Sequence, residues 1–177
     1  RRGDGHEYAL TARALTVNGS PLITDEVIEV IKRDILKWQP TGWELSYFTN
    51  LAAAMDGGQA YGGVFPDTAG HYYGYHFYLY SMLASVAMAV LTVFGVNPFS
   101  SFQIINGIIL LGTIYIARSL EQESRRNSIH VIVTVMFSGV VFYLRWTHPD
   151  LGLWCMLFVG SLALLNLNLT VTLICIT

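Results

Sequence analysis

The chain has 177 residues, of which 53% are hydrophobic and 12% are charged, about half of the roughly 25% that soluble domains carry. A net charge of −2 supplies no basic field, so nucleic acid is excluded as a partner. Nine of the twelve acidic residues and six of the ten Lys and Arg precede Thr68, and long uncharged runs follow. The composition predicts a water-facing first third and a remainder built for a membrane.

The first element expected is a helix that begins near Asp4. Asp4 and Glu7 stand in the spacing of a capping box, in which the first residue caps the helix and the acid three residues later supports it. Gly19 is expected to end this helix, because glycine adopts the left-handed conformation that closes a helix. The apolar face of the helix consists of Tyr8, Ala12 and Leu15.

A second helix is expected from Thr24, its N-cap, to about Trp38. Acidic residues at its start and basic residues towards its end match the helix dipole. Such a helix could lie flat on a membrane or pack on neighbouring helices. Its apolar stripe consists of Val27, Ile31, Ile35 and Trp38.

The segment from Gly57 to Tyr80 is rich in glycine and tyrosine and is predicted to be a loop. Tyrosines together with His71 and His76, just before an apolar run, are typical of the aromatic belt at a membrane interface. The alternative is a loop that stacks against a sugar and forms hydrogen bonds with it.

Four apolar runs follow, each near the roughly 20 residues that a spanning helix needs. They lack the alternation of a membrane barrel, so the fold class predicted is all-α, a polytopic helical membrane protein. The runs are Phe77–Phe94, Phe102–Ala117, Ile129–Leu144 and Leu151 to about Thr172.

The linker between the second and third runs carries Arg118, Arg125 and Arg126. The positive-inside rule places this linker in the cytoplasm, so the next helix runs outward and Arg145 to Asp150 emerges on the outer face. If Phe77–Phe94 spans the membrane, the N-terminal part is cytoplasmic. If this run lies in the outer interface or re-enters it, the N-terminal part shares the outer side with Asp150. Sequence physics leaves both readings open.

Three segments together resemble a known superfamily. GDGHEYALTARAL (Gly3–Leu15) resembles the first outer loop of the GT-C membrane glycosyltransferases, which include protein O-mannosyltransferases and the aminoarabinose transferases of lipid A. The aromatic segment Tyr72–Tyr80, followed by Phe94-Gly95, resembles their next block, and Arg145–Asp150 resembles their acid-bearing second outer loop. In this chain, Gly5 stands where many members have a second acid, and Glu7 where a basic residue is common.

The resemblance implies a division of the chain into three parts. Residues 1–75 would form an extracytoplasmic loop with amphipathic helices, and residues 76–98 a juxtamembrane or re-entrant helix. Residues 99–177 would hold three transmembrane helices, at about 100–118, 127–145 and 151–172. The protein would be a multi-pass protein of the cell membrane with extracytoplasmic active-site loops. We expect the chain to be an N-terminal piece of a longer protein and inactive by itself.

The resemblance also implies a chemistry, the transfer of a sugar from a polyprenyl-phosphate donor to an acceptor hydroxyl. Asp4 would be the general base, and Asp150 would orient the acceptor or share a cation with the phosphate. Both acids could instead be helix N-caps. Arg145 could bind the phosphate or merely extend from the end of a span to the interface. The substrate-binding residues expected are Glu7, Tyr73, His76, Arg145 and His148.

No cofactor is required by this chemistry, although one cation site is conceivable. A divalent ion could be held by His6, Glu7, His148 and Asp150, since imidazole and carboxylate are metal ligands. The partners expected are membrane lipids and a lipid-linked sugar donor, and the sequence does not identify the acceptor. The alternative functions are a polytopic transporter subunit and a non-catalytic membrane protein of polysaccharide assembly. Transporters carry charges at mid-membrane, whereas the charges here lie at the ends of the apolar runs.

Overall fold

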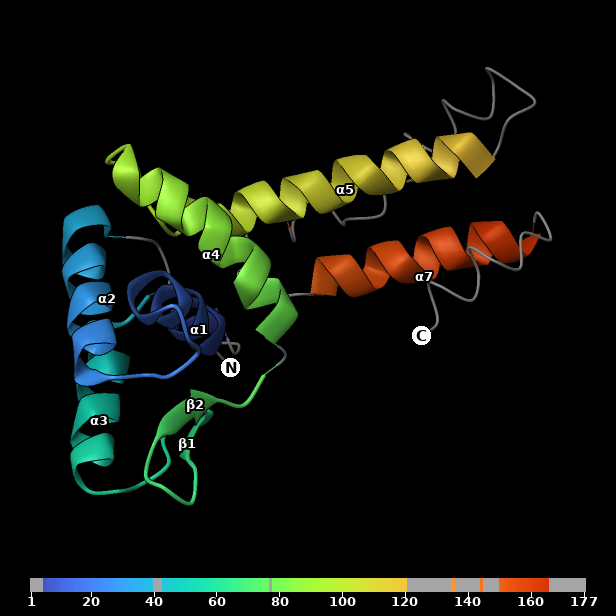
Figure 1. The fold of residues 1–177 in the computed structure, drawn as a ribbon. Coiled ribbons are helices and arrows are strands. Elements are labelled where there is room, and N and C mark those ends of the chain that lie inside the picture. Colours follow the sequence, from blue (N-terminus) through green and yellow to red (C-terminus); the bar gives the residue numbers. More distant parts are fainter. Residues whose placement is uncertain are drawn as a thin grey trace. The chain divides into compact units, whose positions relative to one another are not determined.

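The computed structural model describes residues 5–39, 43–76, 78–120, 135, 144 and 150–165 (Figure 1). Contacts divide the chain into two compact units, Arg1–Phe102 and Gln103–Thr177. The described part is mostly helical, as predicted. Its elements are α1 (Gly5–Asn18), α2 (Asp25–Trp38), α3 (Leu45–Asp56), β1 (Val64–Pro66), β2 (Tyr72–Gly74), α4 (Tyr78–Val93), α5 (Ser100–Leu120) and α7 (Asp150–Leu165).

Helix α1 is the central helix of the first unit. It packs against α2 and α4 and also contacts β2 (Figure 1). Each residue from Glu7 to Ala14 is buried, and the small alanine side chains among them allow close approach of neighbouring helices. Gly19 ends the helix as predicted. Its φ is +66°, and its N–H donates to the carbonyl of Leu15 at 3.1 Å.

Helix α2 confirms the sequence prediction in its bounds and its cap. The backbone N–H of Val27 donates to Oγ1 of Thr24 at 3.4 Å, which satisfies a donor that the first helical turn leaves without a partner. The apolar stripe faces α1 and α3, so this helix packs on neighbouring helices. Its buried residues are Val27, Ile28, Ile31 and Ile35, whereas Trp38 is partly exposed.

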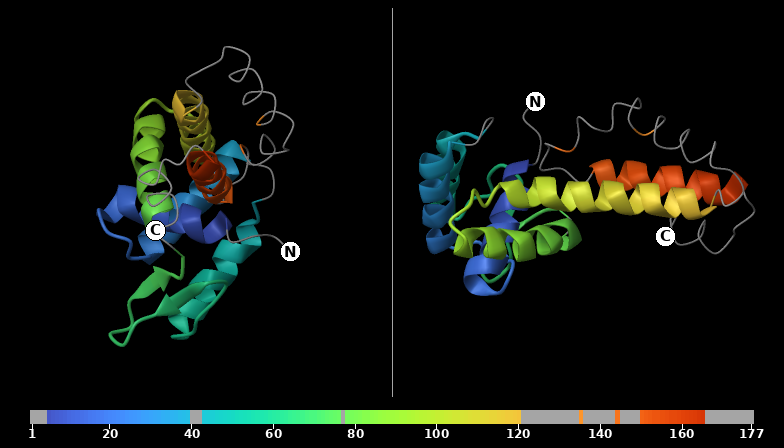
Figure 2. Two further views of the ribbon diagram at one scale, coloured as in Figure 1. Left: turned by 90° about the vertical axis from the view of Figure 1, so that its right-hand side faces the viewer. Right: turned by 90° about the horizontal axis from the view of Figure 1, so that it is seen from above.

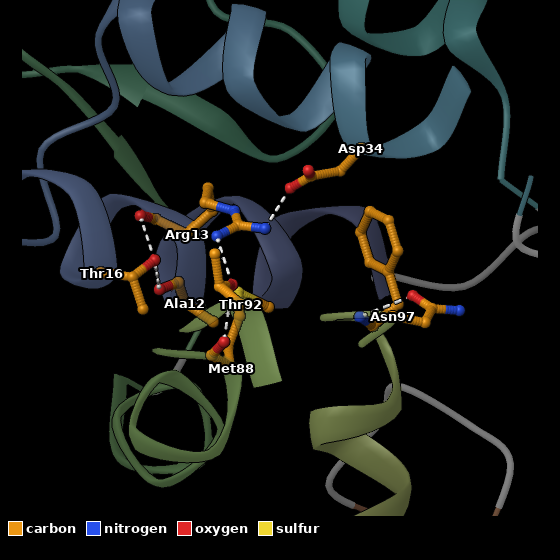
Figure 3. Close-up of polar contacts among 8 residues, drawn as sticks. Ala12, Arg13, Thr16, Asp34, Met88, Thr92 and Asn97 are labelled. Atoms are coloured by element: carbon orange, nitrogen blue, oxygen red, sulfur yellow. Dashed lines mark hydrogen bonds and ion pairs between the residues drawn. The ribbon is translucent and has the colours of Figure 1, made fainter. Parts of the chain in front are cut away.

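A cluster of three polar side chains, of which Arg13 is buried, joins α1, α2 and α4, and we call it the Arg13 cluster (Figure 3). The guanidinium of Arg13 in α1 donates to the carboxylate of Asp34 in α2 and, at 3.3 Å, to Oγ1 of Thr92 in α4. Burial lowers the pKa of Arg13, and the carboxylate of Asp34 opposes that shift. Arginine stays charged in proteins, so a buried guanidinium is stable only next to an opposite charge. The carboxylate of Asp34 therefore fixes the position of the Arg13 side chain.

Two elements of the first unit are absent from the sequence prediction. One is helix α3, which buries Phe48 and Leu51. The other is an antiparallel hairpin of β1 and β2 inside the segment predicted to be a loop. Its register pairs Val64 with Gly74, Phe65 with Tyr73 and Pro66 with Tyr72.

The tip of the hairpin is closed by Asp67. Its Oδ1 accepts the backbone N–H groups of Ala69 and His71, each at 2.8 Å. These bonds, that of His71 first, hold the pKa of Asp67 below its usual value. Directly after this tip, the N–H of Ile23 donates to the carbonyl of Tyr72 at 2.9 Å, so β2 is tied to the connection between α1 and α2.

Helix α4 has two different faces. One packs on α1 through Tyr80, Ser81, Ala84 and Met88, which are buried. With 16 residues the helix is about 24 Å long, shorter than the roughly 30 Å hydrocarbon core of a membrane. The other face is apolar and exposed, and consists of Leu79, Met82, Leu83, Val86, Val90 and Val93.

In the second unit, α5 and α7 run alongside each other (Figure 2). Leu110 and Ala117 of α5 share a buried cluster with Leu151 and Cys155 of α7. Within the described ranges, α5 is the one helix long and apolar enough to cross a membrane, from Ser100 to Ser119. The predicted spans at 127–145 and 151–172 lie largely or partly outside these ranges, so the polytopic arrangement stays a prediction.

The Arg13 cluster should control the stability of the first unit. Asp34→Ala leaves a buried guanidinium without its carboxylate, and breaking such a pair from one side costs about 3 kcal/mol of unfolding free energy. Equilibrium unfolding of the purified full-length protein in detergent measures this. Glu29→Ala is the control, because it removes an exposed partner, 2.7 Å from Lys32, and should cost about 0.5 kcal/mol or less. Equal losses in the two variants would contradict the role of the cluster.

Candidate functional site

Two residues that lie far apart in the sequence of the first unit meet at the start of α1. Oε2 of Glu7 lies 3.4 Å from Nε2 of His76, and the two side chains are 7% and 28% exposed. The His76 ring also stacks on Tyr8, with centroids 5.2 Å apart and an interplanar angle of 22°. Removing a carboxylate from water is costly unless it is paired or hydrogen-bonded, and the imidazole pairs with this one when it carries a proton.

The backbone of the loop before β1 lies against the Glu7 carboxylate. Gly63 has a φ of +88°, and a Cβ at this position would overlap the carboxyl group of Glu7. The carbonyl of Gly63 accepts the N–H of Tyr75 at 2.8 Å, directly before His76. Three segments therefore contribute to the surroundings of Glu7: its own helix, this loop and the approach to α4.

His6 lies in an aromatic group that comes mainly from α3 and the residues before it. Its ring stacks on Tyr47, with centroids 4.5 Å apart and an interplanar angle of 22°. Trp43 and Phe48 meet it edge to face, at 5.2 and 5.5 Å between centroids. The hydroxyl of Tyr47 donates to the carbonyl of Gly62 at 2.7 Å, so this group is tied to the same glycine loop.

This arrangement provides chemistry suited to a ligand with several hydroxyl groups. An ionised carboxylate only accepts hydrogen bonds, whereas an imidazole can donate or accept according to its tautomer. Aromatic rings next to such polar groups supply the apolar surface that ligand sites commonly combine with a few polar contacts. Glu7, His76 and the rings of Tyr8 and Tyr47 present this combination.

The structure brings two of the predicted substrate-binding residues together, namely Glu7 and His76. Tyr73 lies on the other face of β2. Its neighbours Tyr72 and Gly74 are buried, and a Cβ at Gly74 would lie 2.8 Å from Oγ1 of Thr11 in α1. Since alternate residues of a strand point to opposite faces, Tyr73 points away from α1.

The other predicted site residues divide into two groups. Asp4, Arg145 and His148 lie outside the described residues, although α1 begins at Gly5, directly after Asp4 in the sequence. Asp150 belongs to the second unit, where it is exposed and lies in the first turn of α7. An acid in the first turn suits the helix dipole, although Asp150 lies inside the helix and not at the N-cap position that the capping alternative gave it.

The predicted cation site is not assembled within the part of the chain that the structure describes. No group of three or more His, Cys, Asp or Glu residues close enough to hold a metal ion occurs there. One of the four predicted ligands, His148, lies outside that part. The cation therefore stays a prediction.

Sequence reasoning missed the residues that surround Glu7 and His6, namely Trp43, Tyr47, Gly62 and Gly63. One signal was available: two adjacent glycines between a tyrosine and an apolar residue often mark a close backbone approach. The aromatic residues of α3 carried no such signal, because their contact with α1 depends on the tertiary fold.

No family model, curated protein or solved structure matches this chain.

The contact between Glu7 and His76 should stabilise the first unit through the imidazole nitrogen. His76→Ala removes the imidazole next to a buried carboxylate and should lower the unfolding free energy by about 1–3 kcal/mol. His76→Phe keeps a ring on Tyr8 without a nitrogen and should recover little of that loss. Both are measured by equilibrium unfolding of the full-length protein.

His71→Ala is the matched control for these variants. This imidazole also lies near a carboxylate, that of Asp67 at 3.3 Å, but its side chain is 55% exposed. The control should leave stability nearly unchanged. Full recovery by His76→Phe would show that stacking, rather than the contact with Glu7, accounts for the effect.

Proposed function

We propose that this chain is part of a polytopic GT-C-type membrane glycosyltransferase, which moves a sugar from a polyprenyl-phosphate donor to an acceptor hydroxyl at the outer face of the cell membrane. The observation that carries the proposal is the contact of Glu7 with His76. These residues belong to two separate segments that resemble GT-C blocks, and a second contact joins the same segments, Tyr8 to Tyr80 at 5.5 Å between ring centroids.

The proposed reaction is a single inverting displacement. The acceptor oxygen forms a bond to the anomeric carbon while the bond from that carbon to the phosphate oxygen breaks. Asp4 takes the proton of the acceptor hydroxyl as general base, and polyprenyl phosphate leaves with its electron pair. Arg145 neutralises the phosphate through its guanidinium, and Asp150 orients the acceptor.

Glu7 and His76 have a binding role in this proposal. They provide an acceptor and a donor for sugar hydroxyls, and Glu7 follows Asp4 by three residues in the sequence. Tyr73 and His148 complete the proposed set of substrate-binding residues. A general base acts only within about 3 Å of the proton it takes, so contacts that fix the sugar next to it contribute directly to the rate.

The two faces of α4 support a location at the membrane surface. Its exposed apolar residues would lie in the interface while its other face holds α1, in the manner of an interfacial amphipathic helix. If such a helix is too short to span, a cytoplasmic arginine linker after α5 puts the first unit on the outer side. The protein would thus be multi-pass, with its active-site loops extracytoplasmic.

Asp4→Asn tests the proposal in the full-length protein. Loss of a general base should lower turnover by about 10²- to 10⁴-fold while leaving expression normal. The measurement is release of polyprenyl phosphate from polyprenyl-phosphate mannose and polyprenyl-phosphate glucose in reconstituted vesicles. Asp67→Asn, which removes a carboxylate from the exposed hairpin tip, is the control and should retain full turnover. Near-normal release by Asp4→Asn would contradict the assignment, and a transporter subunit or assembly protein would release none in any variant.

A further inference from the structure

The turn formed by Gly62 and Gly63 is held from two sides. Both residues are in the left-handed region, with φ of +54° and +88°. The carbonyl of Gly62 accepts the hydroxyl of Tyr47 in α3 at 2.7 Å, and that of Gly63 accepts the N–H of Tyr75 at 2.8 Å. Tyr61 and Val64 exchange backbone hydrogen bonds of 3.0 and 2.9 Å across the turn. The backbone of the turn is therefore fixed relative to α3 and to the approach to α4.

Gly63 is needed at its position for two separate reasons. Its φ disfavours any residue with a Cβ. In addition, a Cβ would overlap both carboxylate oxygens of Glu7. Gly70 in the same hairpin separates these reasons, because its φ of +83° is similar but a Cβ there would meet nothing within 4 Å. Gly63 combines the backbone requirement with contact to the Glu7 carboxylate, and the adjacent Gly62 combines it with contact to Tyr47.

We propose that Gly63 is a positioning residue, whose bare backbone fixes the Glu7 carboxylate beside His76 where it can accept a hydroxyl of the sugar donor. The choice of ligand rests on the proposed function, whereas the hold of the turn on Glu7 does not. The adjacent Gly62 extends the effect to His6, because its hydrogen bond fixes the Tyr47 ring on which His6 stacks. The turn thus fixes the positions of the His6 and Glu7 side chains, which follow Asp4 closely in the sequence.

The test compares Gly63→Ala with Gly70→Ala, each in the wild-type protein and in the Glu7→Asp background. Both alanines strain the backbone alike, but only the first displaces the Glu7 carboxylate. Displacement of a binding group by about 1 Å can cost up to 10²-fold, so Gly63→Ala should raise the KM for polyprenyl-phosphate mannose or glucose by roughly tenfold or more. Gly70→Ala should change the KM by less than about twofold.

Shortening residue 7 by one methylene withdraws the carboxylate from Gly63. In the Glu7→Asp background, Gly63→Ala should therefore lower the Tm no more than Gly70→Ala does, whereas in the wild-type protein its loss should be clearly larger. If Gly63→Ala alone does not fold, Glu7→Asp should restore folding. Thermal unfolding of the full-length protein measures this coupling without any donor.

The outcomes distinguish this proposal from the proposed function. Equal effects of the two alanines on Tm in both backgrounds, or an unchanged KM in Gly63→Ala, would overturn the positioning role. Coupling in Tm without any sugar transfer by the wild-type protein would support the hold on Glu7 and reject the glycosyltransferase proposal alone.

Discussion

A charge taken out of water destabilises a fold unless an opposite charge or hydrogen bonds meet it, and α1 takes two charged side chains out of water. Arg13 is met by Asp34 and Thr92, so it ties α1 to α2 and α4. Glu7 lies nearer the N-terminus of α1, where its carboxylate contacts His76 and packs on the backbone of Gly63. The contacts of Arg13 and those of Glu7 restrict rotation and translation of α1, because either movement would separate a charged side chain from its partner. The start of α1, where the candidate site lies, inherits that rigidity.

The same packing explains why α4 can lie between the first unit and the membrane interface. One face of α4 packs against α1. The opposite face is apolar and stays exposed. A helix with this division of faces and a length below that of a membrane span fits the interface better than the hydrocarbon core. The proposed location of the site at the outer surface therefore follows from the helix that supports it, together with the arginine linker, rather than from hydropathy alone.

Local signals in the sequence predicted α2 and the end of α1, because a Thr cap and a left-handed glycine act through neighbouring backbone atoms. Helix α3 escaped prediction since Glu44 at its N-cap is not a favoured capping residue and only Phe48 and Leu51 mark a buried face. The hairpin strands have three residues each, too few to show an alternating pattern. The resemblance singled out Glu7 and His76 as substrate-binding residues, but their contact depends on how α1 packs against the segment before α4. The adjacent glycines indicate a close backbone approach at Gly63, but only the packing of α1 determines that Glu7 lies against it.

The most direct measurement of the central claim is a cryo-electron microscopy map of the full-length protein in lipid nanodiscs with added polyprenyl phosphate. The account predicts the lipid phosphate in a cavity at the outer surface, bordered by Asp4 and Asp150 and adjoining the contact of Glu7 with His76. Carboxylates of Asp4 and Asp150 on opposite faces of the bilayer, or a lipid phosphate bound away from the start of α1, would contradict it.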